Sequence, residues 1–264
     1  MFPITLPNIN PVALAIGPIA IRWYSLAYIC GILFAMIFLK KQNERYKIMS
    51  EEAYDNWLMW AVFSVILGGR VGYVLFYNFS FFLTDPLEIF AVWHGGMSFH
   101  GGLAGVIIGM YIFCRKYKIE YFRLTDVLAI AAPVGLFFGR LANFINMELY
   151  GRVTGSSFGV IFPNAGELPR HPSQLYESCL EGLLTFAILF SLSKFTQIQK
   201  RVGALSGGFL ALYGISRIIV ENFREPDEQL GFLFAQITMG QILSLPLIGV
   251  GLWLILQVSL RIRS

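Results

Sequence analysis

The sequence predicts an all-α membrane protein: a bundle of seven transmembrane helices with a small outer head and an N-terminal arm at the membrane interface. Hydrophobic residues make up 56% of the 264 residues, and charged residues only 14%. In a soluble domain about a quarter of the residues are charged. The apolar residues also fall in long runs, and the basic residues gather between alternate runs.

Each spanning helix needs about 20 mostly apolar residues, and its backbone must be helical because lipid offers no hydrogen bonds. The runs that meet this requirement are residues 18–39, 56–77, 96–114, 124–146, 173–193, 203–222 and 237–258. Residues 2–16 are apolar as well, but Pro3, Pro7 and Pro11 interrupt them. We therefore expect residues 1–17 to form a surface arm without a removable signal peptide. The transmembrane domain is then 18–258 and the C-terminal tail 259–264.

Basic residues predict the orientation of the chain. Those between alternate runs, or at the C-terminal end, are Lys40, Lys41, Arg45, Lys47, Arg115, Lys116, Lys118, Arg123, Lys194, Lys200, Arg201, Arg261 and Arg263. Every lysine of the chain belongs to this set. By the positive-inside rule these connections are cytoplasmic, which places the N-terminus outside and the C-terminus inside.

Three arginines lie within predicted helices. An arginine near the helix centre costs about 2.5–3.5 kcal/mol on insertion scales, so Arg70, Arg140 and Arg217 should face the bundle interior. Arginine presents a planar fork of donors that can hold a phosphate or carboxylate by two hydrogen bonds. Each could equally be a structural ion-pair partner, and for Arg70 nothing in the sequence favours more than that.

Two polar stripes surround the other two arginines. Arg140, Asn143 and Asn146 follow one another at a spacing of three, which puts them on one helical face with Glu148 just beyond. In the sixth predicted helix Tyr213, Arg217 and Glu221 follow at a spacing of four, again on one face. The alternative is a Glu221–Arg217 pair that only neutralises a buried charge. Two arginine-centred stripes at outer helix ends favour an anionic ligand such as a phospholipid phosphate.

The glycine-rich segment 94–102 carries two histidines, His94 and His100, at the outer end of the third predicted helix. Histidine can exchange a proton near neutral pH, whereas glycine pairs and a capping histidine could serve packing alone. The spacing of the histidines is not typical of zinc ligands, so we expect no metal. The three cysteines are scattered on apolar helices and predict no disulfide framework.

Residues 148–171, rich in glycine and proline, predict the head, which we expect to contain a short hairpin. The sequence contains no nucleotide-binding loop, nucleophile elbow or zinc-protease motif, which disfavours ATP-driven chemistry and serine or zinc hydrolysis. We expect no cofactor. The net charge of +4 is small and scattered, so nucleic acid is not an expected partner.

Several segments together resemble the prolipoprotein diacylglyceryl transferase family. They are GGMSFHGG at 95–102, GRLANFINMELYG at 139–151, HPSQLYE at 171–177, YGISRIIVENF at 213–223, RWYSL at 22–26 and MGQILS at 239–244. The resemblance extends over essentially the whole chain, and the asparagine-containing run is specific. His94 departs from the family, which has an acidic residue there.

The resemblance implies transfer of a diacylglyceryl group from phosphatidylglycerol to the lipobox cysteine of a preprolipoprotein, which gives a thioether and glycerol 1-phosphate. It implies a multi-pass protein of the bacterial inner membrane whose active site faces the periplasm and whose head is periplasmic. We expect the chain to act as a monomer. The residues implied as essential are Tyr24, His100, Arg140, Asn143, Gly151, Tyr213, Arg217 and Glu221, with Asn146 and Glu148 in support.

These residues suggest roles that the sequence leaves open. We expect Arg140 with Asn143 to hold the phosphate, Arg217 with Glu221 and Tyr213 to hold the headgroup or the thiolate, and His100 to be a base or a structural hydrogen-bonder. A lipid or anion transporter using the same arginines is the main alternative, and a structural scaffold is another. Polar residues at outer helix ends favour surface chemistry over a pathway through the membrane.

Overall fold

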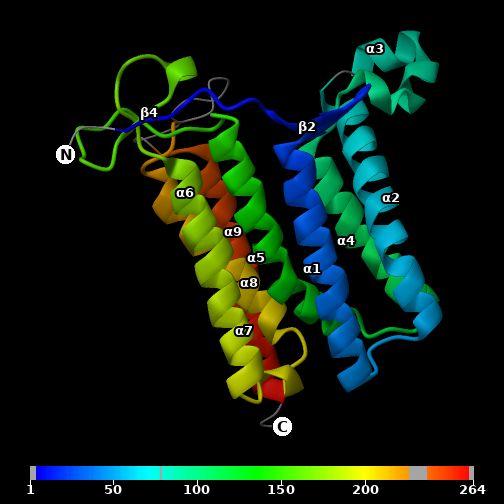
Figure 1. The fold of residues 1–264 in the computed structure, drawn as a ribbon. Coiled ribbons are helices and arrows are strands. Elements are labelled where there is room, and N and C mark those ends of the chain that lie inside the picture. The colour runs from blue at the N-terminus through cyan, green and yellow to red at the C-terminus, as the bar shows by residue number, and fades with distance from the viewer. Residues whose placement is uncertain (1–3, 78, 226–236, 262–264) are drawn as a thin grey trace. The chain divides into compact units, whose positions relative to one another are not determined.

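The computed structural model describes residues 4–77, 79–225 and 237–261 (Figure 1). The side chains of residues 19, 99, 100 and 258–261 lie outside this description. The chain divides into two compact units. We call residues 1–39 with 125–264 the large unit and residues 40–124 the small unit, and each is considered by itself.

Helices lie over all the predicted apolar runs. They are α1 (Trp23–Tyr46), α2 (Glu51–Phe76), α4 (Phe99–Lys116), α5 (Tyr121–Ile145), α6 (Ser173–Glu177) continued by the π-helix η4 (Ser178–Leu184) and α7 (Thr185–Phe195), α8 (Ala204–Glu221) and α9 (Met239–Arg261). Within the described residues, six of these are long and apolar enough to cross a membrane: α1, α2, α5, the α6–α7 helix, α8 and α9.

The outward faces of these helices are apolar. Phe76 is 82% exposed and Leu256 is 62% exposed, and many other large hydrophobic side chains are similarly uncovered. Water would penalise such a surface, whereas lipid is an equally apolar solvent for it. Together with their length and composition, the helices make this a multi-pass membrane protein.

The N-terminal segment is extended, and the first helix begins later than predicted. Strands β2 (Val12–Ile16) and β3 (Ile19–Arg22) pair in antiparallel fashion around Gly17 and Pro18. Gly17 has φ +58°, and proline fixes the next φ near −65°, which suits a tight hairpin turn. Predicted helical residues 18–22 are therefore turn and strand, and α1 starts at Trp23.

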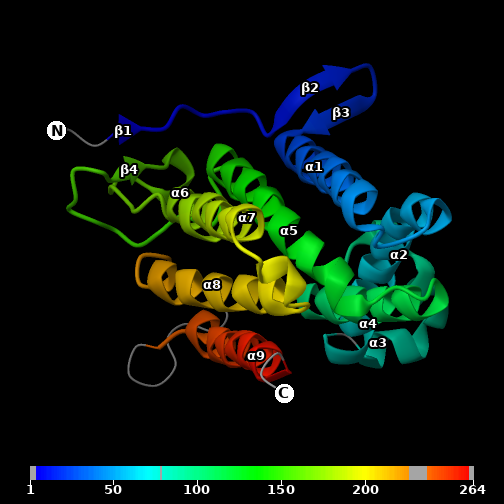
Figure 2. The same cartoon turned by 90° about the horizontal axis from the view of Figure 1, so that it is seen from below.

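In the large unit α8 packs along both α9 and α7 (Figures 1 and 2). The first turn of α8 has no capping side chain of its own. Asp126 of α5 supplies it, accepting hydrogen bonds from the Gly203 amide at 2.6 Å and the Ser206 amide at 2.7 Å. A carboxylate from a neighbouring helix thus satisfies the open amides and favours the positive end of the α8 dipole.

The head follows α5 and includes strand β4 (Val160–Ile161) and the short helix η3 (Pro163–Ala165). The N-terminal strand β1 (Ile4–Thr5) pairs with β4 in parallel, so the tip of the arm belongs to the head sheet. Leu6, Phe162 and Met147 are among the buried residues of its small core. The expected hairpin corresponds to isolated bridges, in which Arg170 pairs with Val160.

In the small unit α2 packs along α4, and a side chain on Gly68 would stand 2.6 Å from the Gly105 Cα, so only glycine permits this approach. Side-chain caps start both helices: Ser50 accepts from the Ala53 amide, and Ser98 from the Gly101 amide. Between α2 and α4 lie three short helices, α3 (Phe79–Thr84), η1 (Pro86–Phe90) and η2 (Val92–His94). A further short helix, η5 (Ile198–Lys200), connects α7 to α8 in the large unit.

Candidate functional site

The polar face of α5 forms one side of the site. Arg140 and Asn143 lie on the same face of this helix, as their spacing predicts. The Arg140 side chain is 17% exposed, and its Nε lies 3.1 Å from Glu177 Oε2 while its Nη2 lies 3.3 Å from Glu181 Oε2. The other terminal nitrogen, Nη1, makes no hydrogen bond or ion pair to any residue that the structure describes. Arg140 therefore keeps one donor edge available for a ligand.

Two fully buried carboxylates come from the helix that runs from α6 into η4. Glu177 and Glu181 are 0% exposed and lie about one turn apart. The π-helical stretch begins directly after Glu177 and contains Glu181. Such insertions are rare and are often found at functional sites. Ser178 within it donates to the Phe137 carbonyl of α5 at 3.2 Å, which ties the two helices together beside the site.

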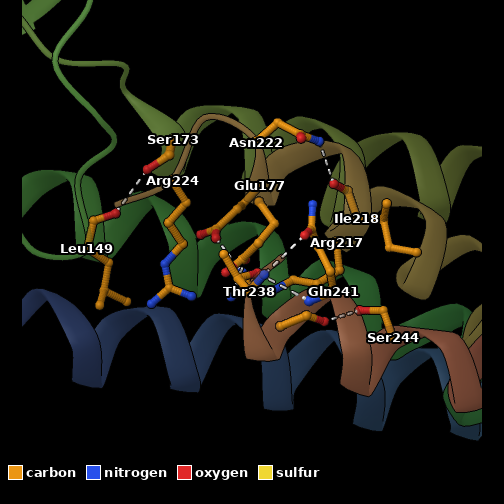
Figure 3. A network of polar contacts seen from close by, with 12 residues as sticks. Leu149, Ser173, Glu177, Arg217, Ile218, Asn222, Arg224, Thr238, Gln241 and Ser244 are labelled. Carbon is orange, nitrogen blue, oxygen red and sulfur yellow. Dashed lines mark hydrogen bonds and ion pairs between the residues drawn. The ribbon is translucent and has the colours of Figure 1, made fainter. Parts of the chain in front are cut away.

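Helix α8 contributes the third side. Arg217 Nη1 lies 2.6 Å from Glu177 Oε1 (Figure 3), and its Nη2 lies 3.0 Å from Glu221 Oε2. Arg217 Nη1 is also 3.8 Å from Glu181 Oε1. Glu177 thus bridges the two arginines, one oxygen to each. We call Arg140, Arg217, Glu177, Glu181 and Glu221 the arginine–glutamate cluster.

Tyr213, one turn before Arg217 on α8, lies beside this cluster. Its ring stacks on Phe209, and it is close enough to Glu181 and Arg217 to interact with them electrostatically. Within the described residues its hydroxyl has no hydrogen-bond partner, and Tyr213 as a whole is half-buried. The hydroxyl is therefore free to meet a ligand beside Arg217.

Glu221 is fixed by the start of α9. A side-chain carbon on Gly240 would stand 2.8 Å from the Glu221 carboxyl carbon, so glycine is required for the carboxylate to lie there. Thr238 and Gln241 bond to each other across the first turn of α9 (Figure 3). The carboxylate therefore lies at a helix N-terminus, where the helix dipole favours negative charge.

A second polar group lies at the C-terminal end of α5. Asn143 Nδ2 hydrogen-bonds to the hydroxyl of Tyr24 from α1, and it is 3.4 Å from Glu148 Oε2. Glu148 is on a turn where Met147 and Leu149 have φ near +55°, a conformation that residues other than glycine rarely adopt. Asn146 is nearby in sequence, and its Oδ1 is buried without a partner in the described structure.

The segment 171–177 supports this turn. Gln174 Nε2 donates to the Glu148 carbonyl at 2.6 Å, and Ser173 Oγ donates to the Leu149 carbonyl at 3.0 Å (Figure 3). The helix that supplies Glu177 therefore also holds the backbone around Glu148. One short motif therefore connects the polar group of Tyr24, Asn143 and Glu148 to the arginine–glutamate cluster.

Gly151 has a steric role in the head. A side-chain carbon there would stand 2.5 Å from the Phe223 carbonyl oxygen and 2.6 Å from the His171 carbonyl oxygen. Its amide donates to His171 at 2.9 Å, and Arg170 donates to its carbonyl at 3.2 Å. Burial, together with the Arg152 guanidinium, lowers the pKa of His171, which is consequently neutral at physiological pH.

Two candidate residues, His100 and Arg70, belong to the small unit. His100 belongs to the first turn of α4, but its side chain lies outside the described structure, so its proposed role as a base stays a prediction. Arg70 has no carboxylate partner among the described residues. Its guanidinium donates instead to the carbonyls of residues 88, 89, 91, 95 and 96. The ion-pair interpretation of Arg70 is therefore replaced by a backbone anchor.

The sequence patterns did not identify Glu177 and Glu181 as site residues. Glu177 closes the HPSQLYE segment, but nothing in that segment indicates its partner. The signal that could have identified both is a pair of glutamates, four apart, at the start of an apolar helix. Charges in such a helix are expensive and usually have partners. Arg140 and Arg217 were the intramembrane cations available as such partners.

The fold and the cluster define a class of protein: a multi-pass membrane protein with two arginines in its helices whose donors can meet a ligand. Arg140 keeps its Nη1 without a partner among the described residues, and Arg217 lies beside the Tyr213 hydroxyl. Such an arrangement can hold an anionic headgroup and stabilise charge that develops on it. The chain belongs to the family described as prolipoprotein diacylglyceryl transferase, whose model matches residues 11–257.

Two relatives in this family share about half of their residues with this chain. A protein of Rickettsia felis named phosphatidylglycerol–prolipoprotein diacylglyceryl transferase is 51% identical over 254 residues, which is 96% of this chain and 98% of the relative. One of the same name from Rickettsia bellii is 50% identical over 259 residues, covering 97% and 98%. Nearly the whole of each relative is therefore represented here.

Proposed function

We propose that this chain transfers the diacylglyceryl group of phosphatidylglycerol to the thiol of a lipobox cysteine in a preprolipoprotein. The products are a thioether-linked lipid and glycerol 1-phosphate. The observation that carries the proposal is the arginine–glutamate cluster, in which Glu177 holds Arg140 and Arg217 together while Arg140 Nη1 is uncommitted. Membership of the family and the names of the relatives support the same reaction.

The reaction breaks the bond between the glyceryl carbon and a phosphate oxygen and forms a bond from that carbon to sulfur. The leaving phosphate gains negative charge as the carbon–oxygen bond breaks. In our proposal Arg140, with Asn143, holds this phosphate and offsets the charge, as preorganised donors do at developing anions. Because guanidinium stays protonated, the arginine acts by charge and hydrogen bonds and not by proton transfer.

The thiol must lose its proton to attack. A free thiol has a pKa of about 8.5, which a positive field lowers. We propose that Arg217, held by Glu177 and Glu221 and flanked by the Tyr213 hydroxyl, supplies that field or clamps the headgroup. His100 is the proposed base. The proton can finally reside on the released phosphate, so the reaction consumes no external acid or base.

Tyr24, Asn143 and Glu148 form the proposed binding edge for the headgroup glycerol. Their hydroxyl, carboxamide and carboxylate already interact with one another, so they are preorganised as donors and acceptors. Asn146 supports this edge in the proposal, and Gly151 allows the close packing of the head against Phe223 and His171.

We also propose the finer topology. Seven helices cross the bacterial inner membrane, namely the six long apolar helices described above and α4. The basic residues at the ends of α1, α4 and α7 face the cytoplasm. The N-terminal arm (1–17) and the head (148–171) are then periplasmic, on the side of the active site, and the tail (259–264) is cytoplasmic. We also propose that the chain acts as a monomer.

The test is mass spectrometry of a lipobox peptide incubated with purified protein and phosphatidylglycerol in detergent. We expect a diacylglyceryl adduct on the cysteine together with glycerol phosphate, and neither with the Arg140→Ala variant. Folded protein that binds the lipid but yields no adduct would contradict the proposal and favour a lipid transporter. The family match and the names of the relatives give no support to that alternative. A scaffold would give no adduct and no specific binding.

A further inference from the structure

The arginine–glutamate cluster contains more acidic than basic groups. Three carboxylates, from Glu177, Glu181 and Glu221, face the two guanidiniums of Arg140 and Arg217. Guanidinium is always protonated. If all three carboxylates were ionised, the cluster would hold an uncompensated negative charge among buried side chains, which is costly. It would also repel the phosphate that the proposed function requires the arginines to bind.

The three carboxylates differ in their distances from the arginine nitrogens. Glu177 has an arginine nitrogen at 2.6 Å from one oxygen and at 3.1 Å from the other. Glu221 has one at 3.0 Å. Glu181 has the longest contacts, 3.3 Å to Arg140 Nη2 and 3.8 Å to Arg217 Nη1. Glu181 therefore lacks the close arginine contact, at 3.0 Å or less, that each of the other two carboxylates has.

The surroundings of Glu181 point the same way. It is 0% exposed, as is Glu177, and its Oε1, like one oxygen of Glu177 and one of Glu221, has no hydrogen-bond partner in the described structure. The charged or titratable groups that face it are Glu177 on its own helix, Arg140 on α5, and Arg217 and Tyr213 on α8. Glu177 repels a second negative charge so close by.

We propose that Glu181 is protonated in the working enzyme, while Glu177 and Glu221 are ionised. The two guanidiniums and two carboxylates then balance, and the cluster is electrically neutral before the lipid binds. Glu181 does not reach the substrate, so it is a positioning residue. It accepts a hydrogen bond from Arg140 through Oε2, which aims the free Nη1 edge without adding a further negative charge that would repel the phosphate.

Glutamine variants test this inference, which rests on the proposed function. Glutamine has the shape of a protonated glutamate and no charge. We expect Glu181→Gln to keep kcat/KM within about threefold of wild type, whereas Glu177→Gln should lose about 100-fold because it breaks the bridge between two buried charges. Glu120→Gln, at an exposed ion pair with Arg123, is the matched control and should leave activity unchanged.

Infrared spectroscopy gives a readout that a purely structural role would not change. The wild-type protein should show the C=O stretch of a protonated carboxylic acid, which shifts in deuterium oxide. This band should be lost in Glu181→Gln and kept in Glu120→Gln. A wild-type spectrum without the band, or a band that survives Glu181→Gln unchanged, overturns the proposal.

The kinetic outcomes are equally decisive. A loss of about 100-fold in Glu181→Gln would mean that the ionised form is needed, and a variant that fails to fold would mean the same, because the amide reproduces a neutral carboxyl. An inactive wild-type protein would instead contradict the proposed function itself. The two failures are thus distinguishable.

Discussion

Replacement of Arg140 by lysine tests the site most directly. The change keeps one positive charge but removes the planar fork that now reaches Glu177 at 3.1 Å with Nε and Glu181 at 3.3 Å with Nη2. A single ammonium cannot hold both carboxyls in these positions and present a further edge to a phosphate. We therefore expect Arg140→Lys to fold but to react slowly.

The size of the effect follows from the hydrogen bonds that lysine cannot replace. At least one hydrogen bond between charged or buried groups disappears, which is worth about 1.5–3 kcal/mol. If the same loss applies in the transition state, kcat/KM falls by roughly 10- to 150-fold, since about 1.36 kcal/mol corresponds to a factor of ten. Arg140→Ala, which leaves the buried Glu177 without this partner, should lose more.

The assay is the initial rate of peptide lipidation at several phosphatidylglycerol concentrations. Arg123→Lys is the matched control, because it makes the same chemical change in an exposed ion pair, where the Arg123 side chain is 45% exposed. We expect this control to react at the wild-type rate. The reasoning is refuted if Arg140→Lys retains activity within about threefold of wild type, which is less than the effect of removing one charged hydrogen bond.

Three further predictions concern the supports of the site. Gly240→Ala should lower kcat/KM at least about tenfold by displacing the Glu221 carboxylate, whereas Gly249→Ala, with open space around it, should not; equal rates would contradict this packing. Asp126→Asn should lower the free energy of unfolding in mixed detergent micelles by about 1–3 kcal/mol, because the α8 amides lose a charged acceptor; an unchanged unfolding midpoint would argue against the cap. Arg70→Gln should speed proteolysis within residues 86–96, since it removes donors from their carbonyls. Cleavage at the wild-type rate would show that this segment keeps its conformation without the Arg70 hydrogen bonds.

Much of the fold could be predicted because the bilayer constrains it strongly. An apolar run that crosses lipid has to be helical, so the helices lie where their runs predict. Prediction failed at the first helix, where residues 18–22 are turn and strand. Apolar content alone does not separate an apolar hairpin from a helix end, and the pairing of β2 with β3 decided it.

The sequence by itself determined which helical faces carry the function. The spacings of Arg140 from Asn143, and of Tyr213 from Arg217, follow from the helical repeat, and the structure has them on common faces. What only the tertiary structure decided is that both arginines share Glu177, about 40 residues away from each, and that Glu181 lies beside them. Helical periodicity specifies the direction of a side chain on its own helix. The partner of that side chain depends on which helices pack together and on how far each is shifted along its axis relative to the other.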